Sequence, residues 1–262
     1  MYSVFEFYKK KIEQEKISVI TCYDFTSAKI VDKTDIDCVL VGDSVSMVMH
    51  GCHNTTGATM EMMALHTTAV ARGIKNKFII ADLPFVSYRK NLSKTISAME
   101  MLIRSGAHAV KLEGADGNVN HIRHAVESGI PVMGHLGLTP QHVNVLGGFK
   151  VQGKDSFSQN KLLRDAKLLE EAGCFSLVLE CIPAELARQI TNSLTIPTIG
   201  IGAGPHTDGQ VLVMHDLLGL QTSIQPKFLK QYFNAESAFS SSINCFVSEV
   251  KEKQYPAVEH CY

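Results

Sequence analysis

Residues that can do acid–base or metal chemistry occur at the ends of several apolar stretches of the chain. They are Asp43 and Ser44, Asp82, Lys111 and Glu113, His135, and Glu180. A single charged residue in such a place more often caps a helix or begins a solvated loop. Ionisable groups at the ends of five stretches are harder to explain in that way, and they indicate a shared site.

Three of these residues, Asp43, Asp82 and Glu113, are carboxylates with no thiolate or histidine pair among them. Oxygen ligands of this kind suit Mg²⁺. Lys111 and Glu113 alternate with Val110 and Leu112, so in a strand they point to the same face. Lys111 could therefore pair with an anionic substrate group or with a developing enolate oxygen beside the metal.

Glu180 belongs to a different apolar stretch, where Leu179, Cys181 and Ile182 flank it. An apolar setting raises the proton affinity of a carboxylate, as a general base near neutral pH requires. His135 is a candidate to hydrogen-bond a substrate carboxylate or a metal-bound water.

Eight short apolar runs must position these residues, and helix-like segments separate most of the runs. The runs are ISVITCYD from 17, CVLVGDS from 38, KFIIADLP from 77, HAVKLEG from 108, IPVMGHLGL from 130, FSLVLECIP from 175, IPTIGIGAG from 196 and VLVMHDLLGL from 211. Apolar residues recur at helical spacing in 93–106, where Ser93 can cap, in 159–173 and in 181–194. The gap HTDGQ before the last run is too short for a full helix.

Eightfold strand–helix alternation predicts an α/β fold with a parallel sheet, and about 250 residues favour a closed (β/α)8 TIM barrel. An open, doubly wound sheet is the alternative. We expect a single domain over residues 1–262, with the amphipathic N-terminal segment as a capping helix. In such a barrel the active site lies at the C-terminal ends of the strands, where the candidate residues fall.

Composition excludes several classes of protein. The 262 residues are 45% hydrophobic and carry a formal net charge of −1, which gives no electrostatic footprint for nucleic acid or an anionic membrane. Seven cysteines form no CxxC pair, so we interpret those in apolar runs as buried side chains in a reducing compartment. The N-terminal residues show no signal-peptide pattern, and no apolar stretch approaches about 20 residues. We expect a soluble, cytoplasmic protein that acts on small molecules.

A collinear series of motifs covers nearly the whole chain. It comprises GDS (42–44), ADLPF (81–85), VKLEG (110–114), VMGHLGLTPQ (132–141), GGFKVQG (147–153), LVLECIP (177–183), IPTIGIGAG (196–204), DGQVLVMHD (208–216), PKF (226–228) and YPAVEH (255–260). This series resembles the ketopantoate hydroxymethyltransferase family.

The resemblance implies a (β/α)8 barrel that transfers a hydroxymethyl group from 5,10-methylenetetrahydrofolate to 3-methyl-2-oxobutanoate, by Mg²⁺-stabilised enolate chemistry. The product is 2-dehydropantoate, an intermediate of pantothenate synthesis. Asp43, Asp82 and Glu113 would be metal ligands, and Ser44 and Lys111, with Asp43 and Asp82, would hold the oxo acid. Glu180 would be the proton acceptor. Bacterial members act in the cytoplasm as homo-oligomers, typically decamers.

Two segments depart from the family pattern. In the loop 45–59, Ser46 replaces a glycine and Thr56-Gly57 replaces Leu-Pro, which predicts a looser loop beside the metal. LLGLQTSIQPKF, residues 217–228, is also atypical. Two other functions stay open. One is an Mg²⁺-dependent 2-oxo acid carbon–carbon lyase of the phosphoenolpyruvate mutase and isocitrate lyase type, and the other is a non-catalytic, degenerate barrel.

Overall fold

The computed structural model of the chain describes residues 3–220 and 226–262. Its residues form two compact units, 1–213 and 214–262. Whether the chain is a single domain stays a prediction. The middle of the atypical segment 217–228, residues 221–225, lies outside the described residues.

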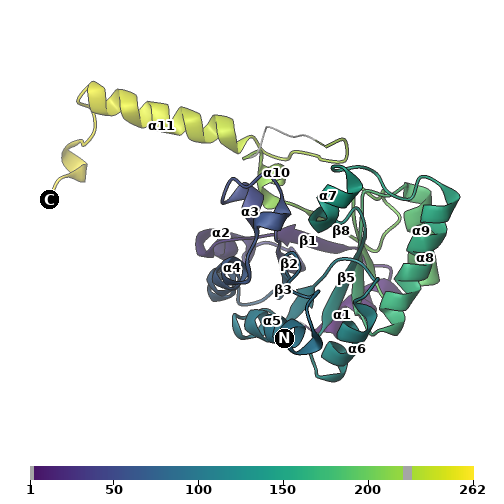
Figure 1. Ribbon diagram of the computed structural model, residues 1–262. Coiled ribbons are helices and arrows are strands. Elements are labelled where there is room, and N and C mark those ends of the chain that lie inside the picture. Colours follow the sequence, from purple (N-terminus) through teal and green to yellow (C-terminus); the bar gives the residue numbers. More distant parts are fainter. Residues whose placement is uncertain (1–2, 221–225) are drawn as a thin grey trace. The chain divides into compact units, whose positions relative to one another are not determined.

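The first unit is a closed barrel of eight parallel strands in sequence order, with β1 paired to β8 (Figure 1). The strands are β1 (Ile17–Thr21), β2 (Cys38–Val41), β3 (Phe78–Asp82), β4 (Ala109–Lys111), β5 (Val132–Gly137), β6 (Ser176–Glu180), β7 (Thr198–Ile201) and β8 (Gly209–Leu212). The prediction of a (β/α)8 barrel is confirmed, and the open sheet is excluded by the β1–β8 pairing.

One helix precedes the first strand of the barrel, and the others lie between successive strands from β1 to β7. In chain order the helices are α1 (Val4–Ile12), α2 (Phe25–Val31), α3 (Val45–Val48), η1 (Thr55–Gly57), α4 (Met60–Gly73), α5 (Leu92–Arg104), α6 (Val119–Glu127), η2 (Pro140–His142), α7 (Val143–Leu146), α8 (Ser156–Glu171) and α9 (Ala184–Ser193). The described residues between β7 and β8 contain no helix, as the gap HTDGQ predicts.

Two predicted element boundaries were wrong by a few residues. The α5 helix is capped by Asn91, whose Oδ1 accepts the Lys94 N–H, and not by Ser93. The last strand begins at Gly209 rather than at Val211, and helix begins again at Met214. The start of the last strand was missed because Gly209 and Gln210 are not apolar and so do not extend the apolar run that marks the strand.

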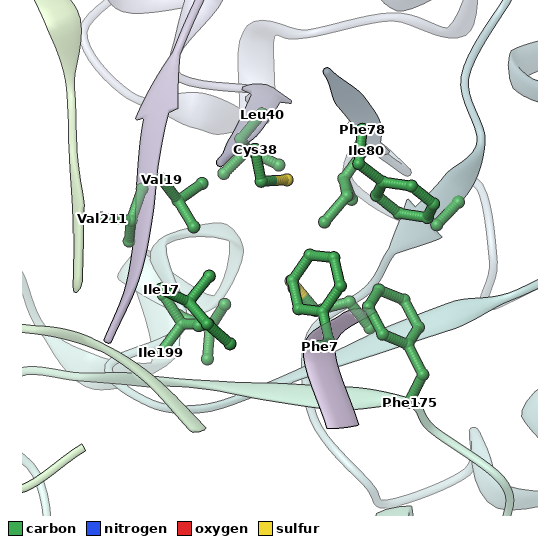
Figure 2. Close-up of a cluster of buried hydrophobic side chains, with 13 residues drawn as sticks. Phe7, Ile17, Val19, Cys38, Leu40, Phe78, Ile80, Phe175, Ile199 and Val211 are labelled. Carbon is green, nitrogen blue, oxygen red and sulfur yellow. The ribbon is translucent and has the colours of Figure 1, made fainter. Parts of the chain in front are cut away.

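Helix α1 closes the N-terminal end of the barrel with one aromatic side chain. Figure 2 shows Phe7 pointing into a cluster of buried side chains that includes Phe78 and Phe175. The ring centroids of Phe78 and Phe175 lie 5.4 and 5.2 Å from that of Phe7, in edge-to-face geometry. Such pairs contribute about 0.5–1.5 kcal/mol beyond the burial of their area. The predicted capping helix is confirmed.

The second unit contains α10 (Met214–Leu218), α11 (Ala235–Lys251) and η3 (Val258–His260). Helix α11 is capped by Asn234, whose side chain accepts the Ser237 N–H. Its exposed side chains include Phe239, Ile243, Phe246 and Val250. Among the described residues, no helix combines the length and apolarity that a membrane span requires.

Candidate active site

The candidate residues gather at the C-terminal ends of neighbouring strands. Asp82, Lys111 and Glu180 are the last residues of β3, β4 and β6, and His135 lies within β5. Asp43 and Glu113 follow β2 and β4 by two residues. Parallel strands end on the same rim of the barrel, so the alternation that points side chains inward brings these groups together. All are buried except Glu180, whose side chain retains 16% of its exposure.

Asp43 and Asp82 are in contact and share a single nearby ammonium group. The Asp43 N–H donates to Asp82 Oδ2 at 3.1 Å, and Lys111 Nζ lies 3.1 Å from Asp82 Oδ1. Burial raises the pKa of Asp43, and so do the negative charges of Asp82 and Glu113. Burial also raises the pKa of Asp82, although Lys111 opposes this. The site therefore holds more negative charge than Lys111 alone can balance.

His135 joins the two halves of the site. Its Nδ1 lies 3.3 Å from Lys111 Nζ and 3.6 Å from Glu113 Oε1, and its Nε2 lies 3.2 Å from Glu180 Oε2. Burial and Lys111 lower the pKa of His135, but Glu113 and Glu180 outweigh them and raise it to about 9. Burial likewise opposes the charge of Glu113, yet the imidazoles of His135 and His142, 3.6 and 3.7 Å from its oxygens, lower its pKa to about 2. His135 is thus held as a cation between two carboxylates.

Ser44 is held by a side chain that the sequence did not single out. The Tyr23 hydroxyl, from the segment after β1, lies 2.8 Å from Ser44 Oγ. The Tyr23 carbonyl lies 2.6 Å from His66 Nδ1, and His66 Nε2 lies 2.8 Å from His50 Nε2. His50 thus pairs with His66 of α4.

Gln141 and Tyr88 are buried at the centre of the site, and sequence reasoning missed both. Gln141 Nε2 donates to Asp43 Oδ2 at 2.8 Å, and the Gln141 N–H donates to Glu113 Oε2 at 3.1 Å. The Tyr88 hydroxyl donates to Gln141 Oε1 at 2.7 Å. The available signal was Pro140, which suits the first position of a helical turn directly after β5 and so fixes the path of Gln141.

The loop after β2 is more firmly held than its sequence predicts. Ser46 lies in α3 and is fully buried, and its Oγ donates to the carbonyls of Asp43 (2.9 Å) and Asn54 (3.1 Å). A helical residue has no need of the positive φ that glycine permits. The expectation that Ser46 loosens this loop was wrong.

The backbone at Cys181, next to Glu180, adopts an unusual conformation. Its φ of 47° lies in the left-handed region, which residues other than glycine seldom adopt. The Cys181 N–H donates to Ile201 O, and its carbonyl accepts the Gln152 N–H, both at 2.9 Å. A strained backbone conformation persists where surrounding hydrogen bonds enforce it. At Cys181 this conformation sets the direction of the chain after Glu180.

The cysteines are all free thiols, in agreement with the sequence-based interpretation. Cys22, Cys38 and Cys174 are buried, whereas Cys181 is half-buried. Burial raises the pKa of the Cys174 thiol to about 12 and that of Cys22 to about 11. Such thiols are poor nucleophiles at neutral pH.

Within the described residues 3–220 and 226–262, no three His, Cys, Asp or Glu side chains already form a cluster that could hold a metal ion. The Lys111 ammonium and the Gln141 amide instead lie against Asp82 and Asp43. The donor chemistry nevertheless suits a hard cation. Buried carboxylate oxygens are the ligands that Mg²⁺ prefers, and a divalent cation would relieve the repulsion that raises the pKa values of both aspartates.

Solved structures similar to this one share its fold at low sequence identity. Phosphonopyruvate hydrolase in complex with oxalate and Mg²⁺ is similar with a TM-score of 0.65 and 11% identity, over 99% of this chain and 93% of that one. 2,3-Dimethylmalate lyase, a member of the PEP mutase/isocitrate lyase superfamily, gives 0.61 and 16%, over 98% and 90%. At this identity the similarity shows the fold alone, so the lyase type is a distant relation only.

Similarity in sequence is far stronger and covers the full chain. The 3-methyl-2-oxobutanoate hydroxymethyltransferase of Francisella tularensis subsp. tularensis (strain WY96-3418) is 57% identical over 262 residues, which is 100% of this chain and 99% of that protein. The enzyme of the same name from Legionella pneumophila (strain Philadelphia 1) is 55% identical over 260 residues, or 99% of each. Residues 2–258 match the profile of ketopantoate hydroxymethyltransferase. The chain belongs to the ketopantoate hydroxymethyltransferase family.

Proposed function

We propose that the buried charged cluster at the C-terminal end of the barrel carries out the hydroxymethyl transfer of this family. In that reaction, 3-methyl-2-oxobutanoate receives a one-carbon unit from 5,10-methylenetetrahydrofolate and becomes 2-dehydropantoate, a step of pantothenate biosynthesis. The observation that carries the assignment is the contact of Asp43, Asp82, Lys111, Glu113 and His135 in one buried cluster within a chain that matches the family from end to end.

Asp43, Asp82 and Glu113 would hold one Mg²⁺. The cluster has four carboxylates, including Glu180, against the cations of Lys111 and His135, so a divalent ion would balance its charge. Bound there, Mg²⁺ would polarise the keto group of the oxo acid and stabilise the negative charge that develops when its C3 proton leaves.

The chain's own residues would bind and orient the oxo acid. The Lys111 ammonium is fully charged, because the attraction of Asp82, Glu113 and Asp43 outweighs burial and raises its pKa. It can therefore neutralise the substrate carboxylate or the developing charge on its oxygen. Ser44 Oγ, oriented by the Tyr23 hydroxyl, can donate to a substrate oxygen.

Glu180 is the proposed proton acceptor. Its carboxylate is the most exposed of the four and comes from β6, across β5 from Lys111 and Glu113. It can remove the C3 proton while the other residues hold the substrate oxygens. C3 then bonds to the one-carbon unit, whose two C–N bonds to the folate break; water supplies the hydroxyl oxygen, and tetrahydrofolate leaves with the C3 proton and one proton of the water. His135 Nε2 lies 3.2 Å away and orients the Glu180 carboxylate.

We also place the protein in the cytoplasm as a homo-oligomer, a decamer by resemblance to bacterial members of the family. The exposed apolar side chains of α11, among them Phe239, Ile243 and Phe246, support self-association, because extended apolar surfaces mark interfaces. Sedimentation velocity of the purified protein tests the assembly.

Turnover by the purified protein tests the function directly. We expect formation of 2-dehydropantoate from 3-methyl-2-oxobutanoate only when 5,10-methylenetetrahydrofolate and Mg²⁺ are both present. Asp82→Ala should abolish Mg²⁺-dependent binding of the oxo acid, measured by calorimetry, without unfolding the barrel, since residues at strand ends serve function more than stability in this fold. Normal oxo-acid affinity and Mg²⁺ response in Asp82→Ala would remove the metal assignment.

A further inference from the structure

Each of the three proposed metal ligands has one carboxylate oxygen engaged by an N–H donor. Asp43 Oδ2 accepts Gln141 Nε2 at 2.8 Å, and Glu113 Oε2 accepts the Gln141 backbone N–H at 3.1 Å. Asp82 Oδ2 accepts the Asp43 N–H at 3.1 Å. The opposite oxygens of Asp82 and Glu113 face the cationic side chains Lys111 and His135. The carboxylates are thus oriented so that one oxygen of each is occupied by the protein itself.

Gln141 provides two of these three donors, and its side-chain amide has only one workable orientation. Nε2 donates to Leu83 O (2.9 Å) as well as to Asp43, while Oε1 accepts the Tyr88 hydroxyl. The Tyr88 oxygen in turn accepts the Glu113 N–H at 3.4 Å. A reversed amide would set Oε1 against a carboxylate and a carbonyl. Gln141 is 3% exposed, so water cannot easily replace these bonds.

We propose that Gln141 is a positioning residue that sets the cation specificity of the site, selecting Mg²⁺ over Ca²⁺. This inference rests on the proposed metal function. By engaging Oδ2 of Asp43 and Oε2 of Glu113, Gln141 would leave each carboxylate only its opposite oxygen for a cation, and at Glu113 the cation would take that oxygen in place of His135.

One oxygen from each carboxylate suits Mg²⁺ and not Ca²⁺. Mg²⁺ requires near-octahedral geometry with oxygens at about 2.0–2.1 Å, whereas Ca²⁺ takes six to eight oxygens at about 2.3–2.6 Å and commonly binds both oxygens of a carboxylate. A carboxylate freed to rotate could offer both oxygens. Release of the Asp43 carboxylate should therefore weaken Mg²⁺ binding more than Ca²⁺ binding.

The test is calorimetric titration of the full-length protein with MgCl₂ and with CaCl₂. Gln141→Met keeps the length of the side chain and the backbone N–H but loses the amide bonds. We expect its Mg²⁺ affinity to fall about tenfold or more, as for other residues that orient metal ligands, with a smaller change for Ca²⁺. Tyr88→Phe keeps Gln141 but removes the donor to its Oε1, and should shift the Mg²⁺/Ca²⁺ ratio in the same direction by less. If Gln141→Met does not fold, the Mg²⁺/Ca²⁺ ratio of Tyr88→Phe tests the inference in its place.

Gln152→Met is the matched control, because within the described part of the chain the Gln152 side chain bonds the Lys150 carbonyl and none of the proposed metal ligands. It should leave both affinities unchanged. If Gln141 served stability alone, Gln141→Met would lower the free energy of unfolding or would lower both affinities equally. An unchanged ratio of Mg²⁺ to Ca²⁺ affinity in folded Gln141→Met or Tyr88→Phe overturns the inference. A wild-type protein that binds neither cation would instead overturn the proposed metal function, and this inference with it.

Discussion

The two ends of the barrel are built from the same eight strands but bury side chains of opposite character. At the N-terminal end, Phe7 packs against Phe78 and Phe175 in an apolar cluster. At the C-terminal end, carboxylates, an ammonium and an imidazole are buried together. Burial of apolar area stabilises the fold, whereas burial of charges is unfavourable unless each charge finds a partner.

The difference teaches that stability and chemistry are separated along the barrel axis. The raised pKa values of Asp43 and Asp82 show that their surroundings oppose the charges that the site needs. The apolar end has no such conflict. Substitutions at the two ends should therefore act on different measurable quantities, and the following predictions test that separation.

The largest effect is expected at the charged end, from Glu180→Gln. Glutamine keeps size and polarity but cannot accept a proton, and loss of a general base lowers the rate by about 10²–10⁴-fold. Exchange of the C3 hydrogen of 3-methyl-2-oxobutanoate with deuterated water, followed by NMR, measures this step without folate. Thermal stability and oxo-acid affinity should stay near wild type.

Glu185→Gln is the control for that variant, since Glu185 is an exposed residue in the first turn of α9. Its exchange rate should equal that of wild type. Exchange at the wild-type rate in Glu180→Gln would mean that another group is the base, and His135 would be the next candidate.

At the apolar end, Phe7→Ala should lower the free energy of unfolding by about 3–5 kcal/mol, because it leaves a cavity among rigid aromatic neighbours. Urea denaturation measures the loss, and the exchange rate per folded molecule should not change. Phe5→Ala, on the same helix but 76% exposed, should cost little. The separation of the two ends fails if Phe7→Ala changes the chemistry of the folded enzyme.

Ser46 tests the charged end for a purely structural contribution. Ser46→Ala removes the hydroxyl donor to the carbonyls of Asp43 and Asn54, and since the Asp43 carbonyl still accepts the Ser46 N–H, we expect a cost of about 0.5–1.5 kcal/mol. Ser46→Gly should be less stable again, by about 1 kcal/mol, because glycine is unfavourable in a helix. Higher stability or activity in Ser46→Gly would contradict the structural account.

The smallest expected effect is a pH dependence of the free energy of unfolding that arises from His108, near the apolar end. Burial lowers the pKa of His108, and its Nδ1 accepts the Ile79 N–H at 2.9 Å, so the folded state favours the neutral ring. The unfolded chain then binds the proton more readily, and the free energy of unfolding falls as pH drops through the unfolded pKa near 6.5. Because much of His108 remains exposed at the surface, solvent screens the effect, and the change in the free energy of unfolding should be small.

His108→Asn preserves a hydrogen-bond acceptor and removes the titration. The difference in free energy of unfolding between pH 7.5 and pH 5.5 should therefore be smaller in this variant than in wild type. His135 contributes with the opposite sign, since its raised pKa stabilises the fold at low pH and that stability is lost as pH rises towards 9. Comparison of the two proteins cancels the His135 contribution, and equal differences would rule out His108.

The strand ends were predictable from sequence because a period of two and a sharp change from apolar to charged residues mark them locally. Asp82 and Lys111 needed no knowledge of distant contacts. Gln141 and Tyr88 could not be found in this way, because they lie in loops that converge only once the barrel closes. Ser46 was misjudged because the missing glycine was taken to require positive φ, whereas the local chain forms a helical turn.

The position of Phe7 has a consequence for how the protein is made. Phe7 leaves the ribosome early, but its partner Phe175 is among the last core residues synthesised, and β1 completes its pairing only with β8. Until residue 212 has emerged, the nascent chain exposes unpaired strand edges and an unfilled apolar opening. Contacts so distant in sequence make folding slow and dependent on the complete barrel. A chain arrested before β8 is therefore a substrate for chaperones and proteases rather than a partly working enzyme.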